Sequence, residues 1–148
     1  MDKIKYVHEE LNKMSSWSIE DFDHNGAHIK THFTTEEEVK RKVEEEGKKV
    51  GAIFLSKEMA ENYIHLALSN PMIRRRVEMW YTVDKFIGKR LLVSYPVDEC
   101  LGYGYRLTDG ELKKFDCKVL TMVFMKDNAE EFYLYTAYPN NENFYKAL

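Results

Sequence analysis

Cysteine is scarce in this chain, which has only Cys100 and Cys117 among its 148 residues. A small domain held together by a framework of disulfides is therefore excluded. Both cysteines lie near apolar residues, which favours two small buried side chains. A single Cys100–Cys117 disulfide is the alternative.

Long apolar runs are also absent. No stretch approaches the roughly 20 consecutive apolar residues that a membrane-spanning helix needs. The first residues, Met1 to Lys5, are not followed by the apolar region of a signal peptide. We therefore expect a soluble chain with no export signal of its own and no membrane contact. The same sequence is compatible with one domain of a larger exported protein.

Net positive charge is the third feature that the chain lacks. The formal net charge is −3 and the pI is near 6.0, whereas a nucleic-acid-binding protein usually presents a basic surface. The charge is unevenly distributed, because residues 71–90 combine Glu78 and Asp84 with a larger set of cations. These cations are Arg74, Arg75, Arg76, Lys85, Lys89 and Arg90. Such a local surface can hold phosphates, and a solvated helix face is the alternative interpretation.

The length and composition are those of one globular domain. We expect a single domain over residues 1–148, with a core of about residues 19–140 and residues 1–18 as an N-terminal helix and linker. Aromatic residues make up 14% of the chain, which indicates aromatic-rich strands in a core or a stacking surface.

Helical patterns occupy the first part of the chain and strand patterns the second. Helices are predicted over residues 2–14, after a capping box of Thr35 and Glu38, over residues 56–68, and from the Asn70-Pro71 pair. Residues 50–55 form a strand or an extended link. Strands are predicted over residues 90–95, 117–125 and 131–138, with a turn at Asp109-Gly110, a hairpin loop at residues 126–130 and a peripheral tail at residues 140–148. This order predicts an α+β fold, with N-terminal helices packed on a C-terminal antiparallel β-sheet.

Three of the five histidines lie in residues 19–33, namely His24, His28 and His32. His28 and His32 are four residues apart and would share one face of a helix. Such a pair suits a metal ion, or an acid or base that works near neutral pH. The glutamate of a metalloprotease motif is missing, because Ile29 follows His28, and no further ligand stands at a suitable spacing. Ordinary polar histidines are the structural alternative.

Two further groups carry chemistry only in combination with the histidines. Strand alternation places Thr136 and Tyr138 on one face, where two hydroxyls can hold a phosphate. Lys40, Arg41 and Lys42 lie on the helix that follows the histidines, and a cation there could face the same cleft. Taken alone, the first group reads as ordinary strand residues and the second as a solvated face.

In their order along the chain, these pieces resemble the bacterial RNase A-like toxin domain at the C-terminus of contact-dependent inhibition proteins and other polymorphic toxins. Its broader relatives are the barnase/EndoU/colicin/RelE-like nucleases. The resemblance runs from about Gly26 to Asn140. It rests on the histidine segment 26–33, the acidic-then-basic helix 36–43, residues 52–60, Trp80, Gly102-Tyr103-Gly104 and the closing Thr136-Ala137-Tyr138-Pro139.

The resemblance implies metal-free cleavage of RNA, possibly tRNA, by attack of a 2′-hydroxyl that leaves a 2′,3′-cyclic phosphate. It implies His32, Lys42 or Arg41, Thr136 and Tyr138 as catalytic residues, with no cofactor and no metal. We expect His28, Arg74, Arg75 and Lys89 to contribute to RNA binding. The expected partners are RNA and a cognate immunity protein, an acidic one docking on residues 71–90. The expected state is a monomer that acts in the cytosol of a target cell.

Two departures from the family pattern leave alternatives open. The first histidine of the opening motif falls on Ala27 when His32 is aligned, so His28 is displaced by one residue. The family's arginine falls on Lys42, a poorer bidentate phosphate ligand, unless a shift makes Arg41 its counterpart. A non-catalytic relative with the same fold, such as a binding or prophage protein, and an unrelated α+β interaction domain are the competing hypotheses.

Overall fold

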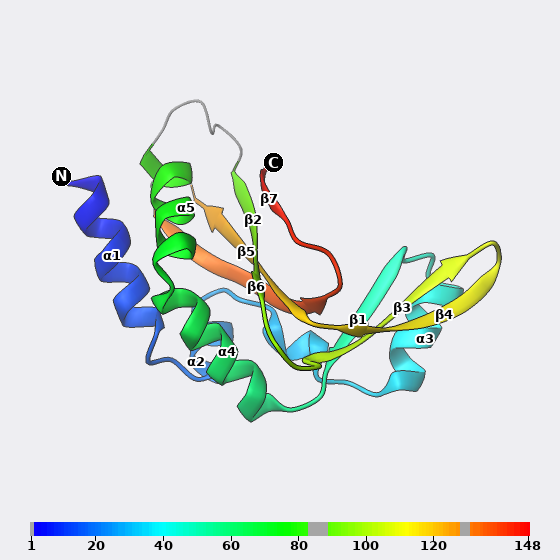
Figure 1. Ribbon diagram of the computed structural model, residues 1–148. Helices are drawn as coiled ribbons and strands as arrows, with labels where there is room; N and C mark the ends of the chain where they lie inside the picture. Colours follow the sequence, from blue (N-terminus) through cyan, green and yellow to red (C-terminus); the bar gives the residue numbers. More distant parts are fainter. Residues whose placement is uncertain (1, 83–88, 128–130) are drawn as a thin grey trace.

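The computed structural model describes residues 2–82, 89–127 and 131–148 (Figure 1). The helices are α1 (Lys3–Met14), α2 (Ile19–His24), the 3₁₀ helix η1 (Ile29–His32), α3 (Glu36–Glu45), α4 (Lys57–Ser69) and α5 (Pro71–Thr82). The strands are β1 (Val50–Phe54), β2 (Arg90–Pro96), β3 (Gly102–Thr108), β4 (Glu111–Cys117), β5 (Val119–Lys126), β6 (Phe132–Asn140) and β7 (Tyr145–Ala147). The predicted α+β class is confirmed. Among the described helices, none is long and apolar enough to cross a membrane.

Polar side chains begin the helices where the sequence predicts. The side chains of Ser56 and Asn70 accept backbone N–H groups at the starts of α4 and α5, as helix-capping residues do. Thr35 likewise accepts the N–H of Glu38 at 3.1 Å. The reciprocal half of the predicted capping box does not form, because the Glu38 carboxylate binds Arg41 instead.

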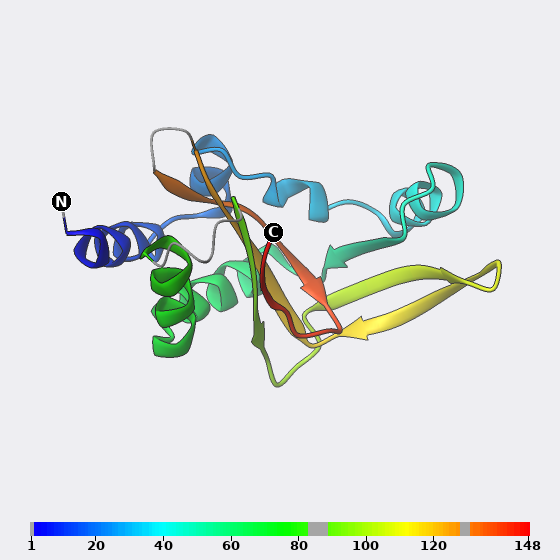
Figure 2. The same cartoon turned by 90° about the horizontal axis from the view of Figure 1, so that it is seen from above.

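The larger sheet has the strand order β6-β5-β2-β7 and is antiparallel throughout. One of its faces is covered by α1, α4 and α5, which form a layer on one side of the molecule (Figures 1 and 2). Val7, Leu11 and Met14 of α1 are buried in the same core as Trp80 of α5 and Phe124 of β5. Burying such a side chain stabilises the fold by about 1.5–3 kcal/mol, so α1 is part of the core.

The smaller sheet, of order β1-β3-β4, extends away from the helical layer and carries α3 on one face (Figure 2). Val39 and Val43 of α3 pack there on Ile53 and Tyr105. Gly102 begins β3 where the chain comes very close to its neighbours. A Cβ at Gly102 would lie 2.0 Å from the Ile53 carbonyl oxygen and 2.8 Å from Pro139. Only glycine fits this crossing of β1, β3 and β6.

One predicted element is wrong, and two predicted segments lie partly outside the residues that the structure describes. Residues 140–148 are not a peripheral tail, because β7 pairs with β2 and the Phe144 N–H donates to Ser94 Oγ at 2.9 Å. A three-residue strand is too short to show alternation in a sequence. Of the hairpin loop at 126–130, residues 128–130 lie outside the described residues, as do residues 83–88 of the basic segment. Both cysteines are free thiols.

Candidate active site

A pocket of about 320 Å³ lies at the junction of the two sheets. The free edge of β1 forms one wall, and η1, α3 and the end of β6 form the others. The lining residues are Thr31, His32, Val39, Lys42, Lys48, Val50, Gly51, Ala52, Thr136, Tyr138, Pro139 and Asn140. The fold therefore brings together His32, Lys42, Thr136 and Tyr138, which are separated by up to about a hundred residues in the sequence.

The backbone around His32 is fixed from both sides. The Asp23 carboxylate accepts the N–H groups of Ile29 at 2.8 Å and Lys30 at 3.0 Å, which fixes the start of η1. Ile29 is buried, and the His28 N–H donates to the Tyr135 carbonyl at 2.8 Å. These contacts attach η1 to α2 and β6, so His32 is presented from a short but anchored turn.

The imidazole of His32 is held in one tautomer. Its Nδ1 lies 3.1 Å from the carbonyl oxygen of Ala52 on the free edge of β1. A carbonyl only accepts hydrogen bonds, so Nδ1 carries the proton. The Tyr138 ring lies 5.6 Å from the imidazole between centroids, and Phe54 meets it edge-on. In the neutral ring, the lone pair is therefore on Nε2, where a general base needs it.

The surroundings of His32 favour the neutral imidazole. Burial is the main cause that lowers the pKa of His32, and the positive charges of Lys48 and Lys42 lower it further. The Ala52 hydrogen bond and the Asp23 carboxylate act in the opposite direction without reversing the shift. His32 is therefore uncharged at neutral pH and is able to accept a proton.

Replacing Lys48 by glutamine is expected to raise the pKa of His32. Removing a nearby positive charge weakens the repulsion that opposes protonation of the imidazole. The measurement is an NMR titration of the His32 ring protons in the wild type and in Lys48→Gln. Lys57→Gln, on α4 and paired with Glu20, is the charge-matched control. An unchanged or lower His32 pKa in Lys48→Gln would contradict this account of the electrostatics.

A bulge in β6 sets the direction of the two hydroxyls. Val123 of β5 pairs with Thr136, but Phe124 pairs with Leu134, so Tyr135 is an extra residue in β6. Such bulges re-aim side chains. Thr136 Oγ1 lies 3.4 Å from the His28 carbonyl, and both Thr136 and Tyr138 line the pocket. Burial raises the pKa of Tyr138, so its hydroxyl stays protonated and is able to donate a hydrogen bond.

The two candidate cations occupy different places. Lys42 lines the pocket. Arg41 does not, and its guanidinium contacts Glu38 at 2.6 Å and Glu46 at 3.0 Å. Of the two alternatives that the sequence leaves open, only Lys42 is brought to His32. The Arg41 guanidinium instead stabilises the surface of α3.

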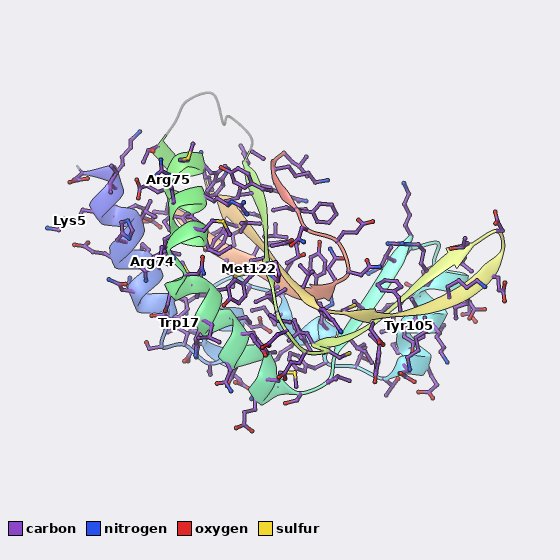
Figure 3. The ribbon with its side chains drawn as sticks, in the orientation of Figure 1. Lys5, Trp17, Arg74, Arg75, Tyr105 and Met122 are labelled. Carbon is purple, nitrogen blue, oxygen red and sulfur yellow. The ribbon has the colours of Figure 1, made fainter. Side chains whose placement is uncertain are left out.

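The predicted RNA-binding residues lie elsewhere. His28 is exposed and contacts the Tyr135 ring at 5.1 Å beside the pocket. Figure 3 shows Arg74 and Arg75 on α5, at the other end of the molecule from Tyr105 of the smaller sheet. Arg74 donates to Asn12 of α1 at 2.6 Å and to the Leu68 carbonyl at 2.7 Å, so it links helices. The structure does not bring Arg74, Arg75 or the exposed Lys89 to the pocket, and their role in RNA binding stays a prediction.

Two participants were missed by sequence reasoning. The carbonyl of Ala52 fixes the His32 tautomer, and no sequence signal marks a backbone group. Lys48 lines the pocket together with Lys42, and no motif in the sequence singles it out. Within residues 2–82, 89–127 and 131–148, no three His, Cys, Asp or Glu side chains are grouped so as to hold a metal ion.

Two comparisons with known proteins gave a match, one to a family and one to a solved structure. The family model described as the bacterial CdiA-CT RNAse A domain matches residues 26–139. A solved structure, the CdiA-CT/CdiI complex from Y. kristensenii 33638, has a chain that superposes with a TM-score of 0.63 at 16% sequence identity. The match covers 76% of this chain and 96% of that chain, and at this identity it shows a shared fold. No curated protein sequence matches the chain.

Proposed function

Because the chain belongs to the bacterial CdiA-CT RNase A domain family, a family of toxin nucleases, we propose that it is an endoribonuclease that cleaves RNA without a metal ion. The observation that carries the proposal is the state of His32. A neutral imidazole with its proton on Nδ1 lines a pocket shared with Lys42, Thr136 and Tyr138. In phosphodiester transesterification, a base can take the proton of the attacking hydroxyl, and a cation and hydroxyl donors can stabilise the charge that develops on the phosphate oxygens.

In the proposed reaction, Nε2 of His32 takes the proton of a ribose 2′-hydroxyl. The 2′-oxygen then forms a bond to the adjacent phosphorus, and the bond from phosphorus to the 5′-oxygen of the next nucleotide breaks. The departing 5′-oxygen takes a proton from water, and His32 returns its own proton to solvent. The products are a 2′,3′-cyclic phosphate and a free 5′-hydroxyl.

The other pocket groups stabilise the charge that builds on the phosphate oxygens. The Lys42 ammonium offsets the extra negative charge of the pentacoordinate phosphorus. The hydroxyls of Thr136 and Tyr138 donate hydrogen bonds to the nonbridging oxygens, for which Tyr138 must stay protonated, as its raised pKa ensures. Burial lowers the pKa of His32, and the positive charges of Lys48 and Lys42 lower it further, so the imidazole is neutral before the reaction.

Incubating the purified chain with total RNA is expected to give fragments with 2′,3′-cyclic phosphate ends, equally with and without EDTA. The chemistry needs only the side chains named above, so removing divalent ions should leave the rate unchanged. Gel analysis of the fragments and mass spectrometry of their ends provide the measurement. Cleavage that EDTA abolishes and that only an added divalent ion restores would refute metal independence and favour the His28/His32 metal hypothesis.

A cell that makes an RNA-cleaving toxin must itself be protected from that toxin. The similar Y. kristensenii chain was solved as a complex of CdiA-CT with CdiI. We propose that this chain likewise binds a cognate immunity protein and that it acts in the cytosol of the target cell. Addition of the product of an adjacent small gene should inhibit RNA cleavage in vitro. Tight binding of that product without any loss of cleavage would count against this role.

A further inference from the structure

A second hollow lies next to the candidate catalytic pocket. It has a volume of about 460 Å³ and is lined by Val43, Gly47, Lys48, Lys49, Val50, Arg106 and Leu107. Lys48 and Val50 line both hollows, so the two are neighbours at the start of β1. We call the second hollow the cationic groove. It lies between the end of α3 and the pairing of β1 with β3, where Val50 is opposite Arg106.

The cations of this groove are available for an anionic ligand. Within the described ranges, Lys48, Lys49 and Arg106 of the groove form no ion pair, and neither does Lys42 of the neighbouring pocket. The acidic side chains Glu38 and Glu46 of the same region are held by Arg41. Arg41 therefore takes up the ion pairs of these carboxylates, and the groove cations stay outside them, although the chain as a whole has a net charge of −3.

Local structure places these cations in a row. Gly47 has a φ of +72° and turns the chain after α3, and the Lys48 N–H then donates back to the Lys42 carbonyl at 3.3 Å. Lys42, Lys48 and Lys49 are thus kept close to one another as the chain enters β1. The Arg106 guanidinium lies over the Phe115 ring, 5.1 Å from its centroid, which restricts its orientation.

Apolar side chains complete the groove. Val50 is 39% exposed and Leu107 is 41% exposed, so apolar surface is open to solvent between these charges. A cationic rim around an apolar surface fits a nucleotide, whose phosphate is anionic and whose base is flat and weakly polar. Bases are accessible in this way only in single strands, because in a duplex they are stacked and paired.

We propose that the cationic groove binds single-stranded RNA beyond the scissile phosphate, with phosphates on Lys48, Lys49 and Arg106 and an unstacked base over Val50 and Leu107. The proposal rests on the proposed ribonuclease function, because it extends the substrate of that same pocket by at least one nucleotide. RNA longer than a dinucleotide is then the substrate class. A particular base is not required, since phosphate contacts carry no sequence information.

The test compares substrates of two lengths. The measured quantity is kcat/KM for a single-stranded hexanucleotide divided by kcat/KM for a dinucleoside monophosphate. In the double variant Lys49→Gln/Arg106→Gln, this ratio should fall by about tenfold at about 0.1 M salt. The slope of log KM against log salt for the hexanucleotide should weaken by about 1.4, at about 0.7 for each phosphate that the variant no longer neutralises. The charge-matched control is Lys3→Gln/Lys5→Gln on the remote helix α1, where Figure 3 labels Lys5. Lys49→Arg/Arg106→Lys, which keeps both charges, should retain the wild-type ratio.

Binding separates this proposal from the proposed function. A fluorescent 2′-O-methyl hexanucleotide lacks the attacking hydroxyl, so fluorescence anisotropy measures its affinity whether or not the chain cleaves RNA. Weaker binding by Lys49→Gln/Arg106→Gln than by Lys3→Gln/Lys5→Gln and by Lys49→Arg/Arg106→Lys supports the proposed role of the groove. Equal binding by all variants overturns it, as does a wild-type chain that binds the hexanucleotide no more tightly than a dinucleotide. Circular dichroism verifies that each variant is folded. If the wild type does not cleave RNA but still binds the hexanucleotide through the groove, the proposed function is refuted and the proposed groove is not.

Discussion

His32→Ala is expected to reduce RNA cleavage by about 10²–10⁴-fold, the typical contribution of a general acid–base group. The substitution removes the imidazole that lines the pocket. Its structural cost should be small, because the ring lines a pocket rather than the hydrophobic core and its one hydrogen bond in the described residues is to the Ala52 carbonyl on a strand edge. The measurement is kcat/KM on a defined oligoribonucleotide, with circular dichroism to confirm the fold.

Two histidines provide matched controls for His32. His24 is exposed at the end of α2 and does not line the pocket, so His24→Ala should cleave at the wild-type rate. His28→Ala should lose much less activity than His32→Ala, because His28 only flanks the pocket against Tyr135. If His32→Ala retains wild-type activity with an unchanged fold, then its proposed role as the base is wrong. The non-catalytic and metal-binding hypotheses would then have to be considered again.

Lys42→Ala is expected to lower kcat by about 10²–10³-fold, the range found when one donor to a developing oxyanion is removed. Lys42 and Arg41 are adjacent on α3, yet only Lys42 lines the pocket, while Arg41 is bound by Glu38 and Glu46. Arg41→Ala is therefore the natural control, since it removes the same charge one residue away. It should leave kcat close to wild type and cost little stability, because exposed ion pairs typically contribute little to it.

Lys42→Arg tests the departure from the family pattern. The variant restores the guanidinium, which binds phosphate oxygens in a bidentate manner, and it should retain or raise activity. The opposite ranking, in which Arg41→Ala is far more damaging than Lys42→Ala in folded proteins, would assign the cation to Arg41.

Much of the fold could be predicted from local signals. Ser56, Asn70 and Thr35 begin helices because their side chains accept orphan N–H groups, and each of these signals lies within four residues of the group it binds. The strand β7 could not be predicted, because three residues show no period, and its place depends on Ser94, fifty residues earlier. The missing half of the Thr35 capping box reflects competition, since Glu38 finds a charged partner in Arg41.

The candidate site was predictable only in part. His32, Thr136 and Tyr138 were identified by their motif order, and strand alternation placed the two hydroxyls on one face. The bulge at Tyr135 lies beside them and is not visible in the sequence, because it depends on the register with β5. The choice between Lys42 and Arg41 depends on how α3 rotates against β1, which Val39 and Val43 decide by packing on Ile53 and Tyr105.

The pocket is built from residues 31–52 together with residues 136–140, and this separation has a consequence during synthesis. Contacts between such distant segments form late, because the long intervening loop must close before they can stabilise the chain. A chain whose β6 is still inside the ribosome cannot bring Thr136 and Tyr138 to the wall of the pocket that carries His32. The pocket is therefore assembled only after β6 has emerged, although His32 and Lys42 are made about a hundred residues earlier. Under the proposed function, the need to protect the producing cell begins at that point.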